Sequence, residues 1–224
     1  MKISKTLLIF VLFFTSNAFA GSKCPELYPM GQVIVVPNTI ELCNLEYVAV
    51  YNPIMRANIF SSERYKINSR TNIGVSFKAD KRISADQRAT LADYAGKESS
   101  IYDRGHMAPA GDMSTNESQR ESNLLTNITP QHSKLNRGSW KKLESTIRNT
   151  TNNNIHILTG AIYAKEYATI GANKIPVPSE YFKCAWYLNS STIVKCYKAK
   201  NTETAIVEET SLNYINAQIN YIIK

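Results

Sequence analysis

The amino-acid sequence predicts an α+β domain. Short runs of β-branched and aromatic residues indicate strands, two stretches carry helical spacing, and the two kinds of element do not alternate regularly. The composition agrees, because a chain of 224 residues that is 43% hydrophobic and 20% charged, with 9 Gly and 8 Pro, is not disordered, collagen-like or coiled-coil. No repeat or low-complexity linker divides it, so we expect residues 21–224 to form one domain.

Residues 1–20 have the pattern of a cleaved secretory signal peptide. Lys2 and Lys5 precede an unbroken apolar run at residues 7–14, and the small residues Ala18 and Ala20 are typical of a cleavage site. A membrane anchor is the alternative, but this run is far shorter than the roughly 20 residues that span a bilayer. No later segment is apolar enough to span, so we expect an exported protein, periplasmic or secreted, without a membrane segment.

The first expected strands are residues 32–36 and 47–51, both rich in β-branched and aromatic residues beside Pro or Asn. Residues 64–88 are polar and basic with little periodicity, which predicts a long loop that carries contacts. A helix is then expected from about residue 136 to 149.

Further strands are expected on either side of a Thr159-Gly160 break and in a hairpin around residues 189–191. These strands are residues 155–158 and 162–163, then 181–187 and 192–197. A last helix is expected over residues 203–223. Its apolar residues recur at three- and four-residue steps on one face, which favours packing on the core over a membrane or a partner helix. They are Leu212, Ile215, Ile219 and Ile222.

The charge balance is basic. The whole chain has 26 Lys and Arg against 18 Asp and Glu, a net charge of +8 at pH 7. Removing residues 1–20 removes two Lys and no acid, which leaves 24 against 18 and a net charge of +6. Such an excess favours polyanionic partners and is no argument about the fold.

Four cysteines remain after residue 20, and an even number in an exported chain favours two disulfides, for which three pairings exist. The favoured pairings are Cys24–Cys43 and Cys184–Cys196, because each joins residues within one short stretch. A zinc site is the alternative, and it is weak because no Cys-x-x-Cys or paired His accompanies the cysteines.

Histidine is scarce, and one of the three stands among other reactive residues. His156 lies in an apolar strand and is expected to be structural, and His132 lies in a turn after Pro-Gln. His106 ends the tetrapeptide Asp-Arg-Gly-His, in which Asp103 and Arg104 supply an acid and a guanidinium.

On a strand, Arg104 and His106 would point to the same face. An imidazole with a pKa near 6.5 can accept a proton at neutral pH, and a guanidinium can bind phosphate through two hydrogen bonds. The pair therefore suits a general base beside a phosphate clamp. A surface ion pair between Asp103 and Arg104 beside a loop histidine is the alternative, and the tetrapeptide alone leaves both open.

A second group of candidates follows along the chain. In a helix that starts at Asn136, Glu144 and Arg148 lie about 80° and 120° around the axis, so all three can share one broad face. An amide oxygen, a carboxylate and a guanidinium there could hold a hydrated hard cation and a phosphate, since Mg²⁺ keeps several waters. A solvated basic face over residues 134–148 is the alternative.

These motifs together resemble the DNA/RNA non-specific endonucleases of the ββα-metal class. The residues that carry the resemblance are DRGHMAP, NLLTNITPQ and LNRGSW with a Glu and an Arg beyond it, and the likeness covers about residues 47–187. It implies a ββα-metal nuclease domain with a central antiparallel sheet flanked by helices. It also implies a divalent metal, Mg²⁺ first and Mn²⁺ second, with DNA and RNA as substrates.

The resemblance assigns roles to the matching residues. His106 matches the general base, Asn136 the direct metal ligand whose cation carries water elsewhere, and Glu144 the acid that orients this water. Arg104 and Arg148 match arginines that hold phosphate. Supporting residues are Asn127, Asn123 and Asp103. Candidate substrate contacts are Arg70, Lys134 and Arg137, with Lys78 or Arg82 as substitutes for Arg70.

The implied reaction is hydrolysis of phosphodiesters to 5′-phosphate and 3′-hydroxyl ends. A cationic nucleic-acid-binding protein without catalysis is the rival, supported by the net charge and by 13 Tyr that could stack on bases. A metal-dependent phosphatase or phospholipase is a third possibility, for which no terminal-phosphate pocket is evident. The set of His106, Asn136 and Glu144 favours the nuclease. The sequence specifies no oligomeric state.

Overall fold

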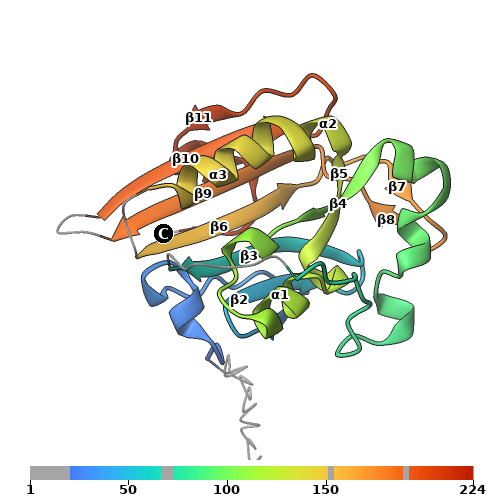
Figure 1. Cartoon of the computed structure of the whole chain (residues 1–224), viewed down its shortest axis with the longest axis horizontal. Helices are drawn as coiled ribbons and strands as arrows, with labels where there is room; N and C mark the ends of the chain where they lie inside the picture. Colours follow the sequence, from blue (N-terminus) through green and yellow to red (C-terminus); the bar gives the residue numbers. More distant parts are fainter. Residues whose placement is uncertain (1–20, 67–72, 151–153, 189–191, 224) are drawn as a thin grey trace, which may run out of the picture.

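The computed structural model describes residues 21–66, 73–150, 154–188 and 192–223, arranged around a seven-stranded sheet (Figure 1). Neighbouring strands are antiparallel and follow the order β1-β2-β3-β6-β9-β10-β11. The bounds are β1 Ile40–Cys43, β2 Tyr47–Asn52, β3 Ala57–Tyr65, β6 Ile155–Ile162, β9 Glu180–Leu188, β10 Thr192–Lys200 and β11 Glu208–Thr210. The predicted α+β class with a central antiparallel sheet is therefore confirmed.

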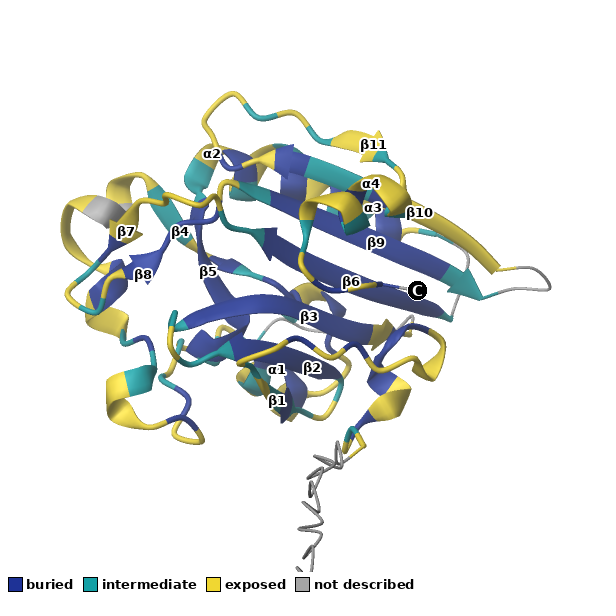
Figure 2. Cartoon of the chain, turned by 180° about the vertical axis from the view of Figure 1, so that it is seen from behind, coloured by how far each residue is buried: buried dark blue, intermediate teal, exposed yellow. Residues whose placement is uncertain are grey.

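Helices and short segments cover both faces of this sheet. One face carries the hairpin of β4 (Tyr102–His106) and β5 (Ile128–His132), together with α3 (Lys141–Arg148), and a cluster of buried residues that includes Trp140 and Ile157 packs between them. The opposite face is covered by α4 (Leu212–Gln218) and the N-terminal segment (Figure 2). The remaining helices and strands are α1 Asn116–Ser122, α2 Ser133–Leu135, a π-helical segment Asn136–Trp140, β7 Thr169–Ile170 and β8 Ile175–Pro176. Short 3₁₀ turns are Pro25–Leu27, Pro29–Gly31, Ala85–Gln87, Leu91–Tyr94, Gly96–Ser100, Ala110–Asp112 and Leu125–Asn127.

Most of the expected strands are confirmed. Residues 47–51 lie in β2, and the expected hairpin is formed by β9 and β10, both longer than predicted. Its turn at 189–191 and the expected signal peptide at 1–20 lie outside the described residues. Within 64–88, residues 64 and 65 end β3, whereas 73–84 contain no strand beyond one bridge from Lys78 to Leu124.

The strand predicted at 32–36 is wrong. Its side chains do alternate, with Ile34 and Val36 buried and Val33 and Val35 exposed, but its backbone pairs with no strand in the part of the chain that is described. The pattern therefore reports a half-buried extended segment, since alternation reflects packing and not ladder hydrogen bonds.

The break predicted at residues 159 and 160 is also wrong, because β6 continues through both. A side chain at Gly160 would overlap the ring of Phe182, which lies opposite it on β9. This glycine marks a close approach of a neighbouring side chain, which is another cause of Gly within a strand.

The helix predicted over 203–223 is confirmed only for residues 212–218. Upstream, β11 pairs with the edge of β10, and Lys198 Nζ lies 3.3 Å from Glu208 Oε2 across that pair. Ser211 then starts α4, since its hydroxyl accepts a hydrogen bond from the backbone N–H of Tyr214. Of the apolar stripe, Ile222 is 62% exposed, because the helix has already ended.

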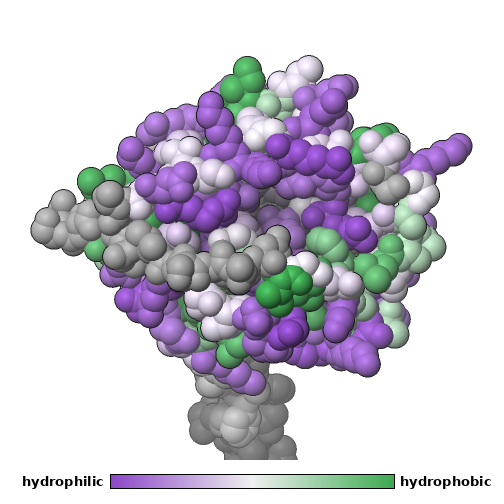
Figure 3. All heavy atoms as spheres, in the orientation of Figure 1, coloured by the Kyte–Doolittle hydropathy of each residue, from purple (hydrophilic) through white to green (hydrophobic). Residues whose placement is uncertain are grey.

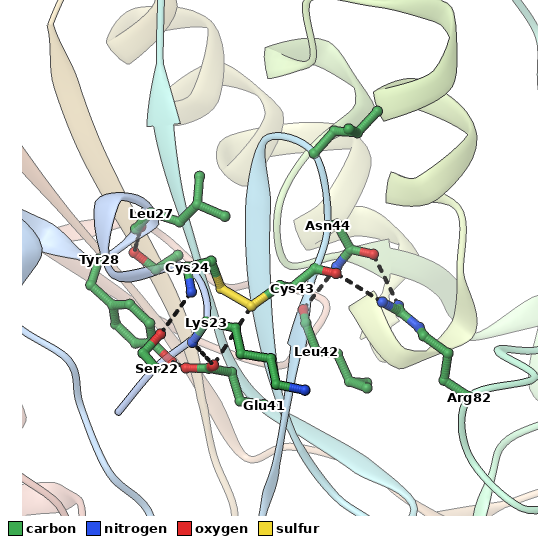
Figure 4. Close-up of a disulfide and its surroundings, with 12 residues drawn as sticks. Ser22, Lys23, Cys24, Leu27, Tyr28, Glu41, Leu42, Cys43, Asn44 and Arg82 are labelled. Atoms are coloured by element: carbon green, nitrogen blue, oxygen red, sulfur yellow. Dashed lines mark hydrogen bonds between the residues drawn. A yellow bond between two sulfur atoms is a disulfide. The ribbon is translucent and has the colours of Figure 1, made fainter. Parts of the chain in front are cut away.

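Both predicted disulfides are present, Cys24–Cys43 and Cys184–Cys196. The first ties the N-terminal segment to the edge strand β1 (Figure 4). The second joins residues directly opposite each other on β9 and β10. Over the described residues, none of the helices has the length and apolar character needed to cross a membrane.

Replacing Cys24 and Cys43 together by alanine is expected to lower the free energy of unfolding by about 3 kcal/mol. The bond closes a sequence separation of 19 residues, and removing it releases that restriction in the unfolded chain. Urea unfolding of the oxidised wild type and the double variant measures the difference. An unchanged midpoint and slope would contradict the expectation.

Candidate active site

The Asp-Arg-Gly-His motif lies on β4, and the end of the motif NLLTNITPQ lies on its partner strand β5. Asp103 pairs with Gln131, and Gly105 pairs with Thr129. A methyl group at Gly105 would lie 2.5 Å from Cβ of Gln131, too close for any larger residue without displacing that side chain. The glycine of the Asp-Arg-Gly-His motif is thus required by the glutamine of the other motif.

His106 is half-buried at the end of β4, and its ring orientation is fixed by Asn123. Its Nε2 lies 2.8 Å from Asn123 Oδ1, while the amide nitrogen of Asn123 donates to the carbonyl oxygen of Val75 at 3.2 Å. Because the Asn123 oxygen can only accept, Nε2 must carry the proton of this bond. In the neutral ring the second nitrogen, Nδ1, is then the proton acceptor.

Arg104 and His106 lie side by side, as the strand spacing predicts. The ring of Phe77 contacts both, with its centroid 5.3 Å from that of the imidazole and 4.6 Å from Cζ of Arg104. Arg104 is exposed, and over the described residues no ion pair involves it. Its guanidinium is therefore available to an anion beside the imidazole.

Burial lowers the pKa of His106 below its ordinary value of 6.5, and the hydrogen bond to Asn123 opposes this shift only in part. The imidazole is consequently neutral at pH 7. This is the form in which a histidine accepts a proton.

If His106 is the base, the acid limb of kcat/KM is expected below pH 6.5. Activity falls as the pH drops through the pKa of the imidazole, because the protonated ring cannot accept a proton. Asn123→Ala is expected to move this limb to still lower pH, since its hydrogen bond raises the pKa. Steady-state rates from pH 4.5 to 8 measure both, and a wild-type limb above 6.5 would exclude His106.

Asn127 fixes the chain just after His106 and is fully buried. Its oxygen accepts from Ser61 Oγ at 2.8 Å and from the Ala108 amide at 2.9 Å. Its nitrogen donates to the carbonyl oxygens of Ala108 and Ser122. A side chain with all these partners cannot reach a substrate, so the geometry suits the supporting role that was expected.

Asn136 opens the π-helical segment between α2 and α3. The predicted helix therefore exists, but regular α-winding from Asn136 is wrong for the first five residues, where Gly138 has non-helical angles (φ −103°, ψ −112°). The angles expected from a regular helix do not hold here. What positions Asn136 instead is a contact with the hairpin.

That contact is made by Asp103. The Asn136 amide nitrogen donates to Asp103 Oδ2 at 2.8 Å, and Arg137 donates to both oxygens of Asp103, at 2.8 and 2.6 Å. Burial alone would raise the pKa of Asp103, but these hydrogen bonds hold it below its usual range. With its nitrogen held by Asp103, Asn136 has its oxygen Oδ1 left for a ligand.

Arg148 and Glu144 lie on α3, each beside an opposite charge. Arg148 Nη1 lies 2.7 Å from Asp112 Oδ1, and a methyl group at Gly111 would lie 2.7 Å from the same nitrogen. Glu144 Oε1 lies 3.7 Å from Lys183 Nζ, and burial raises the pKa of Glu144. The structure thus forms three contact groups, around His106, Asn136 and Arg148, and β4 connects the first two because it carries both His106 and Asp103.

The expected substrate contacts differ in exposure and in whether they are already paired. Arg70 lies outside the described residues. Lys134 is exposed, and Arg137 is exposed but paired with Asp103. Lys78 is exposed too, with its backbone N–H and C=O bonded to Asn123 and Leu125.

Arg82, the second substitute for Arg70, has a side chain that is 39% exposed and that forms contacts within the protein. Its guanidinium is bound to Asp80 at 2.7 Å. It also donates to the carbonyl oxygen of Cys43 and to Asn44 Oδ1, each at 2.9 Å (Figure 4). Arg82 therefore ties the loop around residues 80–82 to the end of β1.

A model of the DNA/RNA non-specific endonuclease family matches residues 34–222. The chain belongs to this family. Among the relatives of this endonuclease-family chain, human mitochondrial endonuclease G is 30% identical over 166 residues, which cover 66% of this chain and 55% of the relative. A nuclease of Serratia marcescens is 31% identical over 131 residues, covering 55% and 49%. The chain thus spans about half the length of these relatives.

A solved structure, that of an EndoG/EndoGI complex, has the same fold. It superimposes with a TM-score of 0.79 at 22% identity and covers 91% of this chain and 92% of that one. The expected ββα-metal fold is confirmed by this likeness.

The donor atoms of this endonuclease-family chain fit a hydrated hard cation. Over the described residues, the only cluster of three His, Cys, Asp or Glu ligands is Cys24, Glu41 and Cys43, whose cysteines are joined in a disulfide. Asn136 Oδ1 and the Glu144 carboxylate are oxygen donors, which suits Mg²⁺ with most of its waters retained.

Three residues beside the site were missed from the sequence: Phe77, Asp112 and Lys183. The signal for Lys183 is visible in hindsight, because it is the one charge inside the apolar run of residues 181–187. The face of the molecule on which α3 lies is mostly hydrophilic (Figure 3).

Proposed function

We propose that this chain is a metal-dependent endonuclease that hydrolyses DNA and RNA to 5′-phosphate and 3′-hydroxyl ends. The observation that carries the proposal is the hydrogen bond from His106 Nε2 to Asn123, which leaves Nδ1 as a proton acceptor beside the exposed guanidinium of Arg104. Family membership supports the same activity.

In this mechanism His106 Nδ1 takes the proton of the attacking water. Arg104, held against Phe77, binds a non-bridging oxygen of the scissile phosphate. Arg148, held by Asp112, offsets the charge that grows on the phosphate in the transition state. General-base action alone contributes about 10² to 10⁴-fold.

Asn136 Oδ1 is the residue atom that would hold the divalent cation, with Glu144 acting on its hydration water. When bound, Mg²⁺ or Mn²⁺ would supply Lewis-acid stabilisation of the phosphate and of the leaving 3′ oxygen. Asp103 serves by holding the Asn136 amide in place.

The substrate is bound through its phosphates, which DNA and RNA share and which carry no sequence information. We therefore expect binding to weaken steeply with salt. Lys134, Arg137 and Arg70 are the proposed outer contacts.

We also propose that residues 1–20 direct export and that residues 21–224 form the nuclease domain, periplasmic or secreted and outside the membrane. The pattern of residues 1–20 and the two disulfides support this, since disulfides persist in oxidising compartments.

Cleavage of supercoiled plasmid and of ribosomal RNA by the purified protein tests the proposal. Nicking of both substrates in Mg²⁺ that stops in EDTA is expected, with 5′-phosphate ends. A gel shift without cleavage in Mg²⁺ or Mn²⁺ would replace the nuclease by a nucleic-acid-binding protein.

A further inference from the structure

A lysine is buried in the sheet directly beneath the proposed site. Lys183 lies near the middle of β9 and its side chain is 1% exposed. Its Nζ donates to Thr159 Oγ1 at 2.5 Å, on the adjacent strand β6, and lies 5.6 Å from the centre of the Trp140 ring. Among the described residues, the nearest carboxylate oxygen is Glu144 Oε1 on α3, at 3.7 Å.

Packing does not call for a charge at this position. An isolated buried ammonium is costly, and a methionine of similar length would fill the same space. Buried ion pairs often add no net stability over apolar side chains of equal volume. The charge of Lys183 is therefore better explained by what it does to Glu144.

The other charges nearby leave Glu144 as the partner of Lys183. Arg148 already binds Asp112. Glu63 on β3 is 2% exposed, and neither of its oxygens receives a hydrogen bond from a donor in the described part of the chain. Burial and the neighbouring Asp112 raise the pKa of Glu63 well above its usual range, and the charge of Lys183 opposes this shift only in part. Among the described residues, Glu144 is therefore the carboxylate that forms an ion pair with Lys183, at 3.7 Å.

We propose that Lys183 is a positioning residue for Glu144: held by Thr159, its ammonium anchors Oε1 and so keeps Oε2 turned toward the cation site. This inference rests on the proposed function, in which Glu144 acts on the hydration shell of the metal. It adds to that function a contact that supports Glu144 from the sheet, since Lys183 lies on β9 and Glu144 lies on α3.

A double-mutant cycle tests this. Lys183→Met, Glu144→Gln and the combined variant are compared for kcat and KM on plasmid, for Mn²⁺ affinity by electron paramagnetic resonance without substrate, and for Tm. Lys183→Met is expected to lower kcat and Mn²⁺ affinity by about 10- to 100-fold with KM for DNA unchanged, as for loss of an outer support of a metal site. In the Glu144→Gln background the same change should have little further effect.

Two further variants sharpen the comparison. Lys198→Met on β10 removes a lysine that also pairs with carboxylates but lies away from the site, and it should leave kcat and Mn²⁺ affinity unchanged. Thr159→Val keeps the lysine but removes its hydrogen bond, and it should give a smaller loss of the same kind. It carries the test should Lys183→Met not fold.

The inference is overturned if Lys183→Met lowers kcat and Mn²⁺ affinity by equal factors with and without Glu144, which is the result of a purely structural role. It is also overturned if both quantities stay at wild-type values. Failure of the proposed function looks different, because Glu144→Gln would then cleave as well as the wild type. The double-mutant cycle measured on Mn²⁺ affinity tests the inference even in that case.

Discussion

Replacing His106 by alanine is expected to lower cleavage of plasmid DNA and of RNA by about 10² to 10⁴-fold, the usual contribution of a positioned general base. The loss should fall on kcat, because the imidazole meets the attacking water and not the bound phosphodiester. Affinity for DNA, measured by gel shift in EDTA, should stay within about twofold of the wild type.

The matched control is His132→Ala. This histidine is also half-buried and ends β5, the partner strand of β4, but its Nδ1 accepts a hydrogen bond from the Lys134 backbone. Cleavage by this variant should match the wild type. Equal activity of His106→Ala and His132→Ala would remove His106 from the mechanism.

Replacing Asn136 by alanine is expected to lower cleavage by about 10² to 10³-fold, since Lewis-acid stabilisation is worth several kcal/mol and each 1.4 kcal/mol is about tenfold in rate. Higher Mn²⁺ concentrations should restore part of the rate, because Glu144 and the phosphate still provide oxygen atoms. Mn²⁺ binding measured without substrate should weaken in parallel.

The Asp103→Ala variant distinguishes the residue that holds the metal ligand in place, Asp103, from the ligand itself, Asn136. It frees the Asn136 amide and Arg137, so the metal affinity should fall by about 10- to 100-fold while the direct ligand remains. The rate at saturating Mn²⁺ should therefore recover more fully than for Asn136→Ala. An Asn136→Ala enzyme with wild-type metal affinity would place the cation elsewhere.

The candidate site could be predicted from the sequence because its parts lie close together along the chain. Asp103, Arg104 and His106 share one strand, and Asn136 to Arg148 follow within one helical region. Such short-range patterns need only strand and helix spacing to be interpreted. The winding at Asn136 could not be predicted, because the π-helical segment depends on contacts with the hairpin.

What the sequence could not show is which distant residues meet beneath the site. Glu63, Thr159 and Lys183 come from three different strands, and only the register of the sheet places them on one face below α3. The error at residues 208–210, predicted as helix, has a similar cause, since these residues pair with the edge of β10.

The layout of the proposed site also bears on protein engineering. The segment from β4 to α3, residues 102–148, carries the proposed base, metal ligand and transition-state arginines, so it is an attractive unit for transplantation into another scaffold. It does not stand alone, because Asn127 and Glu144 make polar contacts with Ser61 and Lys183 of the sheet. In a recipient whose sheet presents only aliphatic side chains, Glu144 and Asn127, which fixes the chain after His106, would lose these polar contacts. The recipient sheet must therefore carry a serine, a threonine and a lysine on three strands, placed as Ser61, Thr159 and Lys183 are here.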